Sequence, residues 1–372
     1  MKRKIKRSLE LFLLILALGI SYFSCTFVLN RAPRGTDRIR VKNFYLEEKN
    51  SLDIVMIGSS YLFTAYSAPL AWHESGLTSY ALATNSAPMG IAKSMIIEAK
   101  KRQDPKLFLI DFTGILYNDT EEINERGLRF WIDSMPHSKN KVKTIKELVP
   151  KKEQNAYLYP ILKYHDNWKD WEHCLSSAFF EIETMIKKEN LAISGYEAMS
   201  TKAKRKDIVD VKDMEETQPL YNSSGKHLKE LLAYLKDNKI DNVAFIIPPR
   251  FYSKSMINER KILNTASKLI KQNGYKIYDL DQSLEAMQLD KNHDYYNAHA
   301  NIYGQRKVTD YLINTLKKDY SLEGKHNHKT KEKWDKEYET YGEVFNTIDR
   351  LIKAGDNKFT SYFKLRERGL IK

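Results

Sequence analysis

The stretch Asp53-Ile-Val-Met-Ile-Gly58-Ser59-Ser60 is a short apolar run bounded by polar and turn-forming residues. A run of this length is typical of a buried strand in a parallel sheet. Gly58 allows a sharp turn, which would place the hydroxyls of Ser59 and Ser60 just beyond the strand. Ligands of open α/β sheets bind at this carboxyl end. The stretch therefore predicts a strand and, after it, a candidate site.

Further apolar runs of the same kind follow along the chain, at Leu107–Phe112, Asn242–Pro248 and Lys276–Leu280. Helical patterns lie between them, at Met89–Lys101 and at Ile257–Asn273, where Gly274 is placed to end the helix. Because strands and helices alternate, we predict an α/β fold with a doubly wound parallel sheet over residues 53–320. Residues 116–239 are expected to form a mostly helical insertion, and residues 321–372 a charged C-terminal helical extension.

The N-terminal segment has the composition of a membrane anchor. Five of the first seven residues are basic, and Leu11–Leu29 contains no charge over 19 residues. A helix of this length spans about 28 Å, enough to cross a bilayer core. We predict a cytoplasmic basic tail (1–10), a single-pass transmembrane anchor (11–29), a polar linker (30–52) and an extracellular remainder. A cleaved signal peptide, with cleavage near Ala17-Leu18-Gly19, and a buried soluble helix are the alternatives.

The formal net charge is +13, from 61 basic and 48 acidic residues. The basic residues are interspersed with acidic ones, which favours a solvated surface, with attraction to an anionic wall polymer as a secondary interpretation. No nucleic-acid-binding motif, Walker loop, Rossmann fingerprint or zincin motif is present, so neither nucleic acid nor a cofactor or metal is expected. The two cysteines, Cys25 and Cys174, are not expected to pair. An exported chain without disulfides weakly favours a Gram-positive source.

A second polar motif lies near the end of the predicted α/β domain, from Asp294 through His299 and Asn301 to Lys307. An apolar-periodic helix, Val308–Leu316, follows it. A histidine in the loop before a terminal helix is placed to approach the first strand, where it could take the proton of a serine while an acid orients it. Taken alone, His299 is more often an ordinary loop residue.

Together the two motifs resemble the SGNH/GDSL hydrolase superfamily. Gly58-Ser59-Ser60 is similar to the family's Gly-Asp-Ser block, with Ser60 at the nucleophile, and the chain is similar to membrane-anchored SGNH-like proteins of Gram-positive bacteria, distantly akin to the lipoteichoic acid D-alanylation protein. The resemblance implies a flavodoxin-like three-layer sandwich. It also implies an oxyanion hole formed by the N–H groups of Ser60 and Ala83, with His299 as the base and Asp294 as the acid that orients it.

Several residues depart from the family pattern. The last block is usually Asp-x-x-His, but Asp294 lies five residues before His299. A literal Asp-x-x-His occurs at Asp290 and His293, without the following helix, and is ranked second. The third block, Gly-x-Asn-Asp, is not recognisable.

The sequence is compatible with two functions. The first is an extracytoplasmic serine ester hydrolase or O-acyltransferase that acts on a cell-envelope polysaccharide or teichoic-acid-like polymer. The second is a non-catalytic surface protein of the same fold that binds a glycan or assists envelope polymer assembly. A short distance between the Ser60 hydroxyl and the His299 ring would favour catalysis, whereas aromatic side chains filling that space would favour binding.

Overall fold

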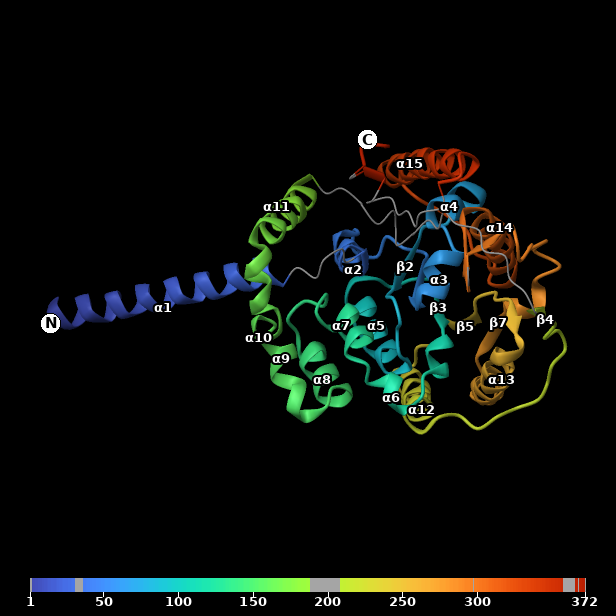
Figure 1. Ribbon diagram of the computed structural model, residues 1–372, viewed down its shortest axis with the longest axis horizontal. Helices are drawn as coiled ribbons and strands as arrows, with labels where there is room; N and C mark the ends of the chain where they lie inside the picture. The colour runs from blue at the N-terminus through green and yellow to red at the C-terminus, as the bar shows by residue number, and fades with distance from the viewer. Residues whose placement is uncertain are drawn as a thin grey trace. The chain divides into compact units, whose positions relative to one another are not determined.

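The structure is a computed structural model that describes residues 2–30, 36–187, 208–296, 298–356, 365–366 and 368–371. The chain divides into two compact units. One contains Met1–Gly35 and Val149–Glu189, and the other contains Thr36–Leu148 and Asn190–Lys372 (Figure 1). The second unit holds the sheet and the candidate site.

The sheet has five strands, all parallel, in the order β2-β1-β3-β5-β7. Their bounds are Ile54–Gly58 for β1, Ser79–Ala83 for β2, Leu107–Asp111 for β3, Val243–Ile247 for β5 and Lys276–Asp279 for β7. The α/β class and the parallel sheet are thus confirmed, with strands at all four predicted runs. The edge strand β2 was not among them.

One group of helices in this unit lies between successive strands of the sheet or, for η5 and α14, after β7. They are α3 (Ser60–Ala65), α4 (Ala68–Ser75), α5 (Met89–Arg102), η1 (Thr113–Leu116), α6 (Asp119–Glu122), α7 (Glu125–Ile132), α8 (Lys139–Leu148), α12 (Asn222–Asp237), η4 (Lys254–Met256), α13 (Ile257–Gln272), η5 (Leu280–Ser283) and α14 (Ile302–Asp319). Helix α5 packs against α8 and α12, whereas α4 packs against α14. Strands β1, β2, β3 and β5 are buried along their whole length, because they lie within the sheet or beneath these helices.

Part of the expected linker is a packed helix, α2 (Thr36–Leu46), which contacts β2. Val41 and Phe44 are fully buried, and Asp37 and Arg40 are buried as an ion pair with an N–O distance of 3.1 Å. These four positions share one face of the helix, which explains why a polar segment folds onto the sheet. The predicted linker over residues 30–52 is therefore wrong for Thr36–Leu46, which form a packed helix.

The region predicted as a helical insertion, 116–239, is mostly helical where it is described. Its middle part forms η2 (Lys151–Glu153), α9 (Gln154–Leu158), α10 (Ile161–Tyr164), η3 (His165–Asp170) and α11 (Trp171–Lys187), all in the same unit as the N-terminal helix α1 (Lys2–Leu29). Residues 188–207 lie outside the described part. A short ribbon of β4 (Ile208–Val209) and β6 (Tyr252–Ser253) follows, and α12 is the helix that leads into β5.

The C-terminal extension contains the long helix α15 (His328–Lys353), which packs against α4. Its buried side chains Tyr341, Val344 and Ile348 form an apolar cluster with Leu70 of α4, Ile302 of α14, and Leu365 and Ile371 near the end of the chain. The Trp72 indole N–H donates to Asp335 Oδ1 at 2.8 Å. The extension is thus part of the folded α/β unit.

The N-terminal helix α1 (Lys2–Leu29) includes a segment, Lys4–Leu29, that is long and apolar enough to cross a membrane. A signal sequence near an N-terminus can meet the same criteria of length and composition. The helix is confirmed, and its membrane role remains a proposal.

Candidate active site

Ser60 is the first residue of α3, directly beyond the carboxyl end of β1. Its hydroxyl oxygen lies 2.9 Å from Nε2 of His299, which is 239 residues away in the sequence. Both residues are partly exposed, so a substrate can reach them. With the proton on Nδ1, the Ser60 O–H donates to Nε2, which is the arrangement that a general base requires. The structure thus brings together the serine and histidine that the sequence predicted.

The turn that presents Ser60 is fixed by Asp111, the last residue of β3. Asp111 Oδ2 accepts hydrogen bonds from the Ser59 N–H at 2.9 Å and the Ser59 hydroxyl at 2.6 Å, and its Oδ1 accepts from the Thr113 N–H at 2.8 Å. A Cβ on Gly58 would lie 2.4 Å from Cβ of Asp111, so only glycine fits here. We assigned no role to Asp111 from the sequence. An acidic residue at the end of an apolar run was the signal that could have identified it.

His299 lies in a small antiparallel ribbon, β8 (Tyr295–Tyr296) and β9 (His299–Ala300), immediately before α14. Its imidazole stacks on the ring of Tyr61, with 5.0 Å between centroids and 14° between planes. Tyr61 follows Ser60 in α3. The residue next to the candidate nucleophile thus helps to orient the candidate base.

Asp294, the predicted orienting acid, has other partners. Its Oδ1 lies 2.7 Å from His293 Nδ1, and its Oδ2 accepts from Lys307 Nζ at 2.7 Å and from the Asp290 N–H at 2.8 Å. Burial acts to raise the pKa of Asp294, but these hydrogen bonds and the Lys307 charge outweigh it, and the pKa is lowered. The predicted contact from Asp294 to His299 is therefore not formed, because the loop turns this carboxylate toward the start of α14.

The second-ranked pair, Asp290 and His293, is part of the same loop. Asp290 Oδ1 accepts from the backbone N–H groups of Asn292 and His293, at 2.7 and 3.3 Å. The His293 ring packs against Tyr303, with 4.5 Å between centroids. These contacts hold the loop and involve neither Ser60 nor His299.

The N–H groups of the two predicted oxyanion donors, Ser60 and Ala83, differ in whether they are available to a substrate. The Ser60 N–H, as the first amide of α3, has no acceptor among the described residues. Ala83 ends β2 opposite Gly58, and the next N–H, that of Thr84, donates to the Gly58 carbonyl at 3.2 Å. Since successive residues of a strand point to opposite sides, the Ala83 N–H points away from β1, as does its carbonyl, which accepts from Arg40 at 3.3 Å. This geometry favours Ser60 and argues against Ala83.

A buried polar cluster lies behind Tyr61. The guanidinium of Arg250, a fully buried residue after β5, lies 5.2 Å from the Tyr61 ring centroid and donates to Glu259 Oε2 at 3.1 Å and to the Tyr252 hydroxyl. The Tyr252 hydroxyl in turn donates to Asp281 at 2.5 Å. Burial raises the pKa of Asp281 to about 6, although Arg250 acts to lower it. No sequence motif links the members of this cluster, which only the fold brings together.

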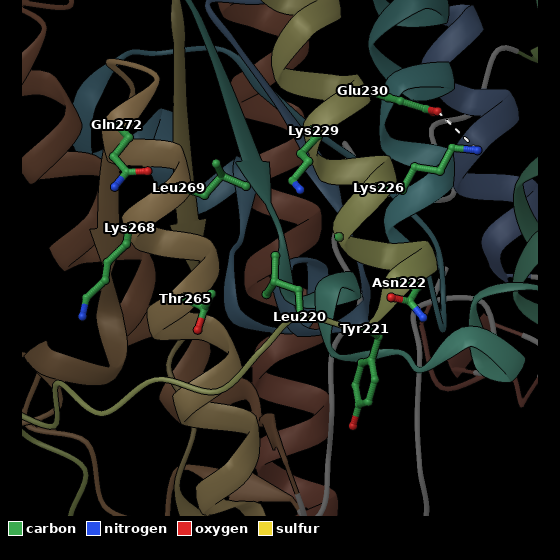
Figure 2. Close-up of a pocket in the computed structure, with 11 residues that line it drawn as sticks. Leu220, Tyr221, Asn222, Lys226, Lys229, Glu230, Thr265, Lys268, Leu269 and Gln272 are labelled. Carbon is green, nitrogen blue, oxygen red and sulfur yellow. Dashed lines mark ion pairs between the residues drawn. The ribbon is translucent and has the colours of Figure 1, made fainter.

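A surface cavity of about 710 Å³ lies between α12 and α13 (Figure 2). Its floor includes Leu220 and Leu269, and Lys226 at its edge pairs with Glu230 at 3.8 Å. Neither Ser60 nor His299 lines it. The candidate chemistry is therefore located at the end of β1 and not in this cavity.

Comparison with known proteins gave no match: no family model, no curated protein and no solved structure corresponds to this chain. The candidate site is thus defined by the geometry around Ser60 and His299.

Proposed function

We propose that this chain is an extracytoplasmic serine ester hydrolase or O-acyltransferase of the SGNH type, with Ser60 as the nucleophile and His299 as the base. The observation that carries the proposal is the 2.9 Å separation between the Ser60 hydroxyl and His299 Nε2. Residues 239 positions apart in the sequence meet in the pairing that activates a serine. A partly exposed site at a strand end gives this pair access to a substrate.

The reaction follows from the positions of these groups. Ser60 Oγ attacks the acyl carbon of an ester while His299 Nε2 takes the hydroxyl proton, and the Ser60 N–H stabilises the negative charge on the acyl oxygen. Protonated His299 then gives the proton to the departing alcohol, which leaves an acyl group on Ser60. Water or a sugar hydroxyl, deprotonated by the same imidazole, takes the acyl group and restores the serine.

The sheet order supports the family resemblance. The order β2-β1-β3-β5-β7 corresponds to the 2-1-3-4-5 order of flavodoxin-like doubly wound sheets. In such sheets ligands bind where the strand order reverses, between the first and third strands. Ser60 follows β1 at this position, next to Asp111 at the end of β3. This is where the SGNH proposal requires the nucleophile.

The proposed location follows from α1. Its apolar segment would anchor the chain, and the basic residues before it would keep the N-terminus in the cytoplasm. The remainder would then face the cell envelope. An ester on a cell-envelope polysaccharide or teichoic-acid-like polymer, such as an O-acetyl or O-alanyl group, is the substrate class we propose.

One observation favours the second function, a non-catalytic protein of this fold that binds a glycan or assists polymer assembly. Asp294 is occupied by His293 and Lys307, so the acid expected to orient His299 does not contact it. A binding protein would not need Asp294 to contact His299.

Hydrolysis of p-nitrophenyl acetate by the full-length chain in detergent separates the two functions. Ser60→Ala and His299→Ala are each expected to lower the rate at least about a hundredfold, because each removes a reacting group. Ser255→Ala and His328→Ala, at exposed positions, are the matched controls and should leave the rate unchanged. A parent without activity, or with activity that both site variants retain, would support the binding function.

A further inference from the structure

Helix α11 exposes a stripe of apolar side chains along one side. The stripe consists of Trp171, Leu175, Phe179, Ile182 and Ile186, at spacings of four, four, three and four residues. At 3.6 residues per turn, these positions fall within an arc of about 80°. Trp171 is 56%, Phe179 66% and Ile186 76% exposed. Large apolar side chains that gather on one exposed stripe mark a contact surface.

The other sides of α11 have a different character. Cys174 and Ala178 are buried next to the stripe, and α11 packs against α1 in the same unit. Glu172, His173 and Ser176 are exposed and polar. The helix therefore has a packed side, a polar side and an exposed apolar side, which is the pattern of a helix that lies at a membrane surface.

This helix begins where α1 ends. The Asn167 side-chain amide donates to the carbonyl of Leu29, the last residue of α1, at 2.8 Å. Trp168, next in the chain, is 61% exposed. Within this unit, the run from α9 to α11 lies crosswise to α1 (Figure 1). If α1 crosses a bilayer, this run lies along the surface at which α1 emerges.

We propose that the α11 stripe and Trp168 insert into the outer-leaflet interface of the bilayer that α1 spans. The occupant is lipid because α11, which carries the stripe, packs against α1, and because Trp168 follows Asn167, which contacts the end of α1. Tryptophan side chains concentrate at membrane interfaces in this position. The surface would make a second attachment to the membrane beside the anchor. This inference rests on the anchoring part of the proposed function and is independent of the chemistry at Ser60.

Quenching by brominated lipid tests the inference in the full-length chain. The chain is reconstituted into phosphatidylglycerol–phosphatidylcholine vesicles, with or without phosphatidylcholine brominated near the top of its acyl chains. Trp168 and Trp171 are expected to lose emission, whereas Trp72, Trp131 and Trp334 are buried in the other unit and should not. The double variant Trp168→Phe, Trp171→Phe should therefore show little quenching.

A second variant tests the stripe itself. Phe179→Ser with Ile186→Ser should reduce the quenching of Trp171, whereas Ile123→Ser, at an exposed apolar position of the other unit, should not. Vesicle flotation is measured in parallel. A chain that floats with the vesicles but is quenched no more than the double Trp variant would overturn the surface proposal alone. A chain that does not float would overturn the anchor and the surface together, whatever the esterase assay shows.

Discussion

The Tyr61 ring lies next to both the buried guanidinium of Arg250 and the ring of His299. Arg250 Cζ is 5.2 Å from the Tyr61 ring centroid, and the His299 ring stacks on Tyr61. A cation favours an aromatic face, and a flat neighbour restricts how the imidazole can rotate. In the proposed mechanism, Tyr61 would be a positioning residue that holds the His299 ring against Ser60 without reacting itself.

This position predicts a contrast between two Tyr61 variants. Tyr61→Phe keeps the ring and should retain near-parental hydrolysis of p-nitrophenyl acetate. Tyr61→Ala removes the ring and should lower kcat about ten- to a hundredfold through loss of orientation, with little change in KM. Steady-state kinetics across pH check this result. Equal loss in both variants would instead assign a role to the hydroxyl.

Asp294 gives a stability prediction with a defined pH dependence. Its pKa is lowered in the folded chain, so its contribution is present above the unfolded pKa of about 3.9 and is lost as pH falls through the folded value. Asp294→Asn should lower the unfolding free energy at pH 7 by about 1 kcal/mol, since Lys307 and His293 are partly exposed. The difference in unfolding free energy between the parent and the variant, measured by urea titration, should become smaller below pH 4. A gap that stays constant with pH would contradict the assignment.

At the scale of the element, α5 is capped by a residue distant in the sequence. Pro88 precedes the helix and has no side-chain cap, whereas Glu122 accepts from the Gly90 N–H at 2.6 Å and the Met89 N–H at 3.2 Å. Glu122 Oε1 also lies 2.7 Å from His227 Nδ1 on α12. One buried carboxylate therefore joins three helices, α5, α6 and α12.

Replacement of this cap should weaken the fold. Glu122→Ala leaves two helix N–H groups and His227 without their acceptor, and we expect a loss of about 1–3 kcal/mol in unfolding free energy. Glu215→Gln, in an exposed segment, is the control and should change stability by less than about 0.5 kcal/mol. Denaturant unfolding followed by circular dichroism measures both. Equal midpoints for the two variants would show that water replaces the cap.

At the scale of the whole molecule, the C-terminal extension closes one side of the α/β unit. Helix α15 buries Val344 and Ile348 in the cluster with Leu70 and Ile302. His326, just before the helix, lies 2.8 Å from Asp53, the residue that precedes β1. The extension thus contacts the residue before β1, the strand that leads to Ser60, and the first residue of α14, the helix that follows His299.

Removal of one buried side chain from this cluster should loosen the extension. Ile348→Ala is expected to lower the unfolding free energy by about 2–5 kcal/mol and to expose the lysine-rich start of α15 to trypsin. Asn346→Ala, exposed on the same helix, should leave the cleavage rate unchanged. Limited proteolysis with mass spectrometry distinguishes the two. Parental resistance in Ile348→Ala would show that α15 is held by other contacts.

The sequence alone determined the features that depend on local pattern. The apolar runs before Gly58 and Phe112 predicted buried strands because continuous apolar side chains are buried on both faces of a parallel sheet. The uncharged run Leu11–Leu29 predicted a long apolar helix, because the length and composition of a run are also local properties of the sequence. The pairing of Ser60 with His299 was predicted from strand ends and the family resemblance, and the structure brings the two side chains together.

Only the tertiary structure decided the features that depend on contacts between distant segments of the chain. Ser79–Ala83 became a strand because β1 supplies its backbone hydrogen bonds, and the expected linker became α2 because β2 covers its apolar side. Asp294 pairs with His293 and Lys307, although the family resemblance implied that it would orient His299. Arg250 meets Tyr61 only in the folded chain. Local pattern specifies the elements, whereas a side chain's partner depends on which elements the fold brings within hydrogen-bond distance.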